Sequence, residues 1–466
     1  MRFIVFLWTL NSYLIHTLKY FCLLKIFFFA KYSEFCLTMP NINFHGWLKK
    51  LFKFEINITI KHKDVIFCGF LEFLMGCVTV GVPISVSLDI LYWIKQQISP
   101  DIDANILDLL NQWILKKKVP KSNEILKVST AAKIPFGYFF LEHPPKEECA
   151  LIHCRTVDSV SVNTPSRELI DIHNIMANAQ NWMSEYNKEV LELSPLSFVG
   201  RFDVNSSVED VVTDIRQNLQ VNVEWFKKFS RAEDSFKFLK NKISNIGILV
   251  MQNGVVGNSN NRKLNIKEFR AFTLIDEYAP LIFINNNDSK KGKIFSLIHE
   301  LAHIEIGENN LFNDNFSNVT VSHQEKFCNA IAAEFLVPKN IFKEQWNRTD
   351  ENLNIKFLEL SSFFKCSTLV IARRALDFGY ITSEIYKEVA TLAKDEFEES
   401  KNLRKMSTPN GGSCYNTLKS RWDKNFIMAL DNSTKSGETR YVDAYRLVGL
   451  KGKTFHELVE RLVKTS

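Results

Sequence analysis

The chain has 466 residues, of which 46% are hydrophobic and 24% are charged, so it is long enough for two or three globular domains. Its formal net charge is +6, and residues 1–64 hold this whole excess, since they contain nine Lys and Arg against three Asp and Glu. The rest of the chain is neutral overall, so net charge alone gives no electrostatic case for nucleic-acid binding by the main body.

The nine cysteines are scattered along the chain, without the paired spacing of a disulfide framework or of a zinc ribbon. Free thiols in this number are typical of proteins in a reducing compartment. We therefore expect the protein to be cytoplasmic.

Residues 1–84 are predicted to form an apolar, basic extension that precedes the folded domains. Phe3–Leu18 and Phe73–Leu88 carry no charge, but each is shorter than the roughly 20 apolar residues that span a bilayer. The extension also lacks a clean signal-peptide cleavage site. A membrane-anchored protein is therefore only a third hypothesis for this chain, and we do not expect it to bind a membrane.

Residues 85–145 are predicted to form a short helical unit, and residues 146–240 a helical connecting region. The spacing of apolar residues places helices at Leu88–Ile98, Ala104–Leu115, Ser122–Lys133, Pro165–Leu193 and Ser206–Leu219. Helices thus account for most of this part of the chain.

Residues 241–345 change to a mixed pattern, with strands predicted at Gly247–Met251 and Ala279–Asn285. The polar residues before Lys290 can cap a helix over Lys290–Ile306, which Gly307 ends. A second helix is predicted over residues 322–336, before Pro338. This region is the predicted core of the protein.

Residues 346–406 are predicted to form helices again, at 354–364, 367–377 and 383–400. A break rich in Gly, Ser and Asn at Ser407–Ser413 opens a helical tail, residues 407–466. The predicted fold class is α+β, mostly helical, with a small sheet.

The segment Ile298–Gly307, with the sequence IHELAHIEIG, carries the clearest chemistry in the chain. His299 and His303 are four residues apart, so on a helix their imidazoles share one face and can bind one Zn²⁺. Glu300 adjoins the first histidine, where it can act as a general base. The surrounding helix is apolar, so these groups need either a metal or neighbouring side chains to satisfy them. We interpret the motif as the catalytic centre of a zinc metallopeptidase.

A third protein ligand is expected from outside the motif, because catalytic zinc usually takes three. Glu325 lies 22 residues after His303, at the start of the second helix, and we predict it as that ligand, with His323 as its rival. Asn329, one turn beyond Glu325, can orient one of the metal ligands by a hydrogen bond without binding the metal itself. Glu334 lies on the other side of the same helix and is predicted to be a surface or structural charge.

These motifs resemble the ImmA/IrrE family of zinc metallopeptidases. The resemblance rests on HELAH at residues 299–303, Glu325 with Cys328 and Asn329, AAEFLVP at 332–338, and EFRAFTLIDEYAPLIFIN at 268–285. It implies a gluzincin-like fold, with zinc ligands His299, His303 and Glu325 and with Glu300 as the base. It also implies limited cleavage of a repressor of the Xre type, and we expect that substrate to pair its backbone with an edge strand near Ala279–Asn285.

Longer proteins of this kind often begin with a helix-turn-helix domain, and we interpret residues 85–145 as a degenerate region that resembles one. Trp113 and Pro120 match the pattern at the end of such a domain, whereas Lys116 replaces its glycine.

Residues 360–381 carry a second helix-turn-helix-like pattern. Ser367 can cap its second helix, which would expose Arg373 and Arg374 to DNA phosphates. The other interpretation is a packing helix with solvated charges. The alternative function is therefore a transcriptional regulator with a sensor-like peptidase domain.

Overall fold

The structure is a computed structural model that describes residues 82–98, 102–145, 165–307, 311–312, 323–348, 352–406 and 414–464. Nearly all of the predicted N-terminal extension lies outside these described residues. The chain divides into two compact units, one of residues 1–85 and 111–128 and the other of residues 86–110 and 129–466. No helix within the described ranges combines the length and the apolar run that crossing a bilayer requires.

Three short helices open the described chain, close to their predicted positions. They are α4 (Leu88–Gln97), α5 (Ala104–Ile114) and α6 (Ser122–Ala132), and the 3-10 turn η1 (Phe136–Phe140) follows them. Trp113 and Pro120 are buried. Lys116 has a φ of 57°, the left-handed conformation that favours glycine. The lysine thus adopts a backbone conformation that a glycine at this position would adopt at lower cost.

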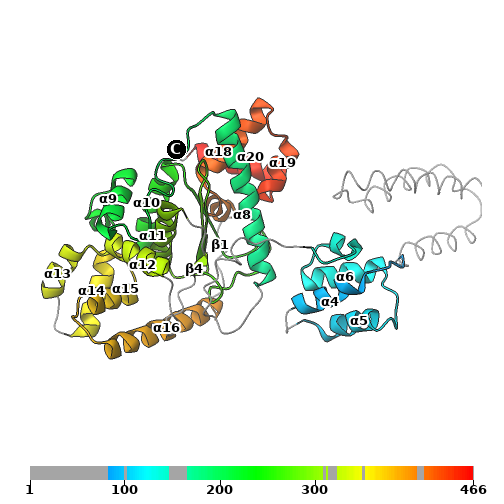
Figure 1. Cartoon of the computed structure of the whole chain (residues 1–466), viewed down its shortest axis with the longest axis horizontal. Coiled ribbons are helices and arrows are strands. Elements are labelled where there is room, and N and C mark those ends of the chain that lie inside the picture. Colours follow the sequence, from blue (N-terminus) through cyan, green and yellow to red (C-terminus); the bar gives the residue numbers. More distant parts are fainter. Residues whose placement is uncertain are drawn as a thin grey trace, which may run out of the picture. The chain divides into compact units, whose positions relative to one another are not determined.

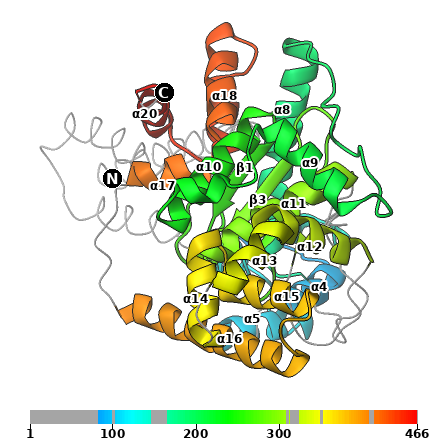
Figure 2. The same cartoon turned by 90° about the vertical axis from the view of Figure 1, so that its left-hand side faces the viewer.

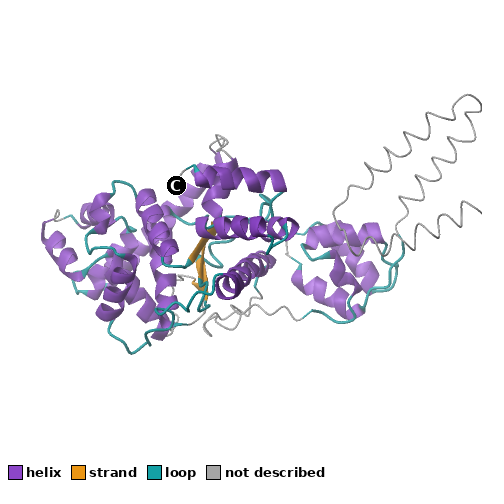
Figure 3. Ribbon diagram, turned by 90° about the horizontal axis from the view of Figure 1, so that it is seen from above, coloured by secondary structure: helices purple, strands orange, loops and turns teal. Residues whose placement is uncertain are grey.

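A four-stranded sheet lies at the centre of the larger unit (Figure 3). Its order is β1 (Leu249–Asn253), β3 (Leu281–Asn285), β2 (Ala271–Leu274) and β4 (Leu311–Phe312). β3 runs parallel to β1 and antiparallel to β2, so strands bond it on both sides. β3 is therefore not an edge strand, which corrects the expected position of Ala279–Asn285 at an edge, because strand order depends on long-range pairing that local patterns do not reveal. The pairing of a substrate with an edge strand near these residues stays a prediction.

Alternate residues of the strands enter two different cores, as the period of two along a strand requires. One core takes Val250, Ala271, Ile282 and Ile284, and the other takes Leu249, Met251, Phe272, Leu274, Leu281 and Phe283. Helices α10 (Ala232–Asn245) and α11 (Lys290–Ile306) lie against the first face, and α12 (His323–Leu336) packs on α11 (Figure 1). Helix α8 (Arg167–Glu185) covers the second face together with the C-terminal helices.

The remaining helices extend these two layers. α9 (Val208–Leu219) packs on α12, and α14 (Leu353–Phe364) packs on α13 (Lys339–Arg348) and on α15 (Thr368–Asp377). α16 (Ser383–Met406) packs on α15 at the edge of this layer (Figure 2). The C-terminal set consists of α17 (Cys414–Arg421), α18 (Lys424–Ser436), α19 (Tyr441–Val448) and α20 (Gly452–Val463). The predicted fold class, α+β and mostly helical with a small sheet, is confirmed.

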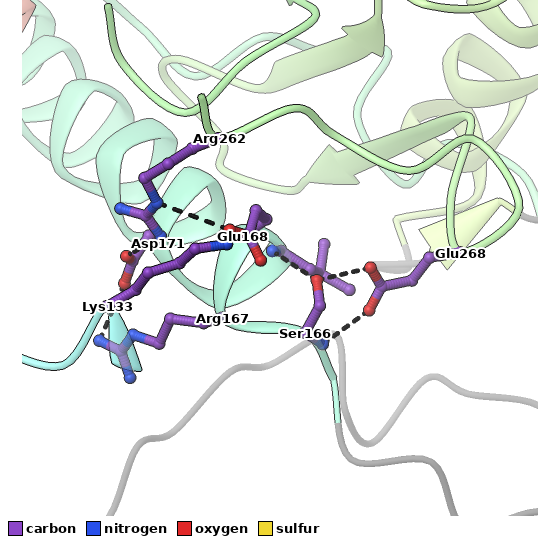
Figure 4. Close-up of polar contacts among 8 residues, drawn as sticks. Lys133, Ser166, Arg167, Glu168, Asp171, Arg262 and Glu268 are labelled. Atoms are coloured by element: carbon purple, nitrogen blue, oxygen red, sulfur yellow. Dashed lines mark hydrogen bonds and ion pairs between the residues drawn. The ribbon is translucent and has the colours of Figure 1, made fainter. Parts of the chain in front are cut away.

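Helix α8 is anchored at its N-terminus to the connection between β1 and β2 (Figure 4). The Ser166 N–H and hydroxyl donate to the Glu268 carboxylate at 2.7 and 2.6 Å, and Arg262 Nη2 donates to Asp171 Oδ2 at 2.6 Å. At its other end the regular helix stops at Glu185 and continues as a π-helical turn to Val190. The predicted helix was longer, because apolar spacing alone does not mark this change.

Helix α11 begins and ends at the predicted residues. Ser289 caps it by accepting a hydrogen bond from the backbone of the first turn at 2.9 Å. Gly307 ends it with a φ of 80°, and a Cβ at Gly307 would lie only 2.9 Å from Gly200 Cα. The Gly200 N–H in turn donates to Ile304 O at 3.0 Å, so both ends of α11 are fixed.

Candidate metal centre

Helix α11 presents both histidines of the HExxH motif on one buried face. His299 and His303 are 0% exposed, and their Nε2 atoms are 3.1 Å apart. The spacing of four residues brings the two rings to a centroid distance of 4.8 Å. The imidazoles therefore converge on one point, as the motif predicts.

Glu325 reaches the same point from the first turn of α12. Its Oε2 lies 3.3 Å from His299 Nε2, and its Oε1 lies 3.4 Å from His303 Nε2. Burial alone would raise the pKa of Glu325, but hydrogen bonds and charges from the two histidines outweigh it and hold that pKa well below its usual range. His323, the rival candidate, is exposed at the beginning of α12 and is not part of the group.

The three donor atoms fit a single metal ion. Tetrahedral coordination with bonds of about 2 Å separates neighbouring ligands by about 3.3 Å, and the observed separations are 3.1, 3.3 and 3.4 Å. Two imidazole nitrogens and one carboxylate are also a ligand set of catalytic zinc sites. Among the described residues, no other cluster of three or more His, Cys, Asp and Glu is arranged to hold an ion.

Cys328 lies behind His303, where sequence reasoning had placed no residue. Its thiol is buried, and Sγ is 3.5 Å from His303 Nδ1, the ring nitrogen that faces away from the group. Asn329, predicted to orient a ligand, is half-buried, and that role stays a prediction. The spacing of three residues between Glu325 and Cys328, which share a helix face, was the signal available in the sequence.

Glu300 is completely buried, and its two carboxylate oxygens have different surroundings. Oε2 accepts a hydrogen bond of 2.5 Å from the Thr273 hydroxyl, whereas Oε1 has no hydrogen-bond partner among the described residues. Burial raises the pKa of Glu300 well above its usual value, Thr273 opposes this rise, and the charge of Glu325 adds to it. Oε1 is thus a proton acceptor without a competing donor.

The two arginines predicted to face DNA differ from each other. Arg374 is 7% exposed, forms an ion pair with Glu334 and donates to Val337 O at 2.9 Å. The prediction that Arg374 contacts phosphates is wrong, because its guanidinium holds α15 against the end of α12. Arg373 is exposed and pairs with Asp377 at 3.0 Å, so its contact with DNA stays a prediction. Ser367 caps α15, as predicted.

Comparison with known protein families adds two matches. A peptidase-family model described as the IrrE N-terminal-like domain matches residues 248–376, which run from β1 to α15 and include both helices of the centre. A model described as a domain of unknown function (DUF8813) matches residues 422–461, which include α18, α19 and most of α20. No curated protein and no solved structure matches the chain.

Proposed function

Since the chain belongs, through residues 248–376, to the ImmA/IrrE family of peptidases, we propose that it is a zinc-dependent endopeptidase. The observation that carries the proposal is the convergence of His299, His303 and Glu325 at separations that suit one tetrahedral ion. The residues that would hold the zinc come from two packed helices of the matched domain. A buried, carboxylate-bearing group of this kind is costly without a cation.

The chain's own residues divide the chemistry between them. His299 and His303 would hold the metal through Nε2, and Glu325 would hold it through its carboxylate. When bound, zinc supplies Lewis acidity and makes a water nucleophilic near neutral pH. Glu300 then accepts the proton of the attacking water at Oε1 and passes it to the departing amine. Burial of the site excludes competing bulk water and strengthens these interactions.

For the substrate we propose a repressor of the Xre type, cleaved in the cytoplasm. The support is the family to which the peptidase domain belongs, together with nine cysteines without disulfide spacing. The alternative, a regulator that acts mainly through DNA binding, loses support because Arg374 is buried. Of the predicted pair, only Arg373 is exposed.

Co-expression with an Xre-type repressor encoded by a neighbouring gene tests the proposal. We expect the wild-type chain to cleave the repressor and Glu300→Gln to leave it intact, because Gln cannot accept the proton. Glu305→Gln is the matched control, since Glu305 is also completely buried in α11 but lies outside the metal group. Cleavage by Glu300→Gln at the wild-type rate would contradict the proposal.

A further inference from the structure

Thr273 places a hydroxyl on the face of the sheet that α11 covers. It lies in β2, where Phe272 and Leu274 enter the core on the opposite face and Ala271 enters the core beside α11. Thr273 is completely buried, in a position where an apolar residue would fill the same space. A buried hydroxyl is retained at little cost only if it has a hydrogen-bond partner.

Within the part of the chain that the structure describes, the Thr273 hydroxyl bonds only to Glu300. Thr273 Oγ1 lies 2.5 Å from Glu300 Oε2 and 3.2 Å from Glu300 O. A hydroxyl has one proton to donate, so the nearer carboxylate oxygen receives the main hydrogen bond. The contact joins the middle of the sheet directly to the side chain proposed as the general base.

Thr273 is also a rigid anchor. Its β-branched side chain has few χ1 rotamers, and its backbone pairs with Ile282 in the central strand β3. A glutamate side chain has three rotatable bonds, so a free Glu300 carboxylate would sample several positions. The hydrogen bond from a fixed hydroxyl restricts that sampling and leaves Oε1 without another donor among the described residues.

We propose that Thr273 is a positioning residue for Glu300, whose Oε2 it holds so that Oε1 is the atom that exchanges the proton with substrate water. This inference rests on the proposed peptidase function. It adds a residue from β2 to a centre otherwise built from α11 and α12. Precise orientation of a general base contributes to the rate of the chemical step and little to substrate binding.

The test compares Thr273→Val, which removes the hydroxyl and keeps the shape, with Thr273→Ser, which restores it. The probe is a peptide that the wild type cleaves from a library made by digesting a bacterial proteome. We expect Thr273→Val to lower kcat about 10- to 100-fold with KM within about twofold, because only proton transfer is impaired. Thr273→Ser should recover most of kcat, and the zinc content of both variants should match the wild type.

Ser296→Ala is the matched control, because Ser296 is a buried hydroxyl of α11 whose Oγ has no hydrogen-bond partner among the described residues. We expect its kcat to equal the wild-type value. A crystal structure of Thr273→Val gives a second readout that does not depend on activity, and we expect the Glu300 carboxylate to occupy more than one position.

Three results would overturn the inference: wild-type kcat in Thr273→Val, no recovery in Thr273→Ser, or a single unchanged Glu300 position in the crystal. Failure of the proposed peptidase function would give different cleavage results. In that case the wild type cleaves no library peptide, or Glu300→Gln cleaves as fast as the wild type, and the role of Thr273 falls with it.

Discussion

Buried polar side chains on the two faces of the central sheet find their partners in different ways. Near the face that α8 covers, Gln180 Nε2 donates to Leu274 O at 2.7 Å, and Asp423 Oδ2 accepts from Val250 N at 3.2 Å. These two side chains thus form hydrogen bonds with backbone groups of the strands. On the α11 face, Thr273 bonds to the Glu300 side chain, and the two histidines converge with Glu325 on one point.

Under the proposed function, this difference separates structural polar residues from those of the metal centre. Bonds between side chains are the smallest share of hydrogen bonds in folded proteins, about 10–15%. A buried group of them therefore needs a reason, and metal binding with proton transfer supplies one. On the α8 face, by contrast, stability should come from apolar packing, with polar residues closing the ends of strands and helices.

The largest effect on stability is expected from Phe283→Ala on the α8 face. Phe283 is completely buried, and its ring stacks on Phe272 with a centroid distance of 5.0 Å. Removing it leaves a cavity, and we expect the free energy of unfolding in urea to fall by about 3–5 kcal/mol. Phe140→Ala, at a ring that is 52% exposed, should change it by less than about 0.5 kcal/mol. A loss below about 1 kcal/mol would mean that Phe283 is not tightly packed in the core on this face.

Arg374 lies on the α11 side of the sheet, but we consider this buried polar residue structural. Arg374→Ala tests that interpretation. Its loss leaves Glu334 without its ion-pair partner and Val337 O without its donor, so we expect a destabilisation of at least about 3 kcal/mol. Arg373→Ala, one residue away and exposed, should cost less than about 0.5 kcal/mol. Urea denaturation of both variants measures the difference. Equal unfolding free energies for the two variants would show that Arg374 contributes no more to stability than Arg373.

Lys240 lies in α10, and its Nζ donates to Ser420 O in α17 at 3.1 Å. Burial lowers the pKa of Lys240 to about 8, although Asp423 opposes the shift. The unfolded chain, whose lysine pKa is 10.5, then binds more protons than the folded chain between pH 8 and 10.5. Stability therefore rises with pH across this window.

Lys240→Met removes this dependence. Relative to the variant, the wild type should gain about 2 kcal/mol of unfolding free energy between pH 7.5 and pH 10. Urea denaturation at the two pH values measures the gain, and Lys237→Met, at an exposed lysine of the same helix, is the control. A wild type that follows Lys240→Met at both pH values would show that the ammonium is well solvated.

The smallest effect is expected from Cys328, whose Sγ lies 3.5 Å from His303 Nδ1. Cys328→Ala should weaken zinc binding about 10-fold, because the ring loses a partner that orients it. Cys328→Ser keeps a small polar group and should bind zinc more tightly than Cys328→Ala. Competition with a chelating dye measures both affinities. Identical zinc affinities in the wild type and both variants would show that Cys328 only fills space in the core.

Local patterns predicted the parts of the centre that lie close together in the chain. The HExxH spacing, the Ser289 cap and Gly307 define α11, and the distance from His303 to Glu325 selected the third donor. All of these depend on helix geometry, which repeats every few residues.

Long-range contacts were not predictable in the same way. Thr273 meets Glu300 from a strand that the sequence analysis did not identify, and β4, α10 and α13 were also missed. Arg374 looked exposed because a partner 40 residues away, Glu334, cannot be paired with it from spacing alone. The order of the strands is another long-range property, which is why β3 was expected at an edge.

Zinc content tests the central claim most directly. Metal analysis of the purified wild-type chain should give about one zinc per chain, whereas His303→Ala and Glu325→Ala should retain less than about a tenth of that amount. His323→Ala, which removes the exposed rival at the start of α12, should keep the wild-type amount. Equal zinc content in the wild type and in His303→Ala would contradict the account.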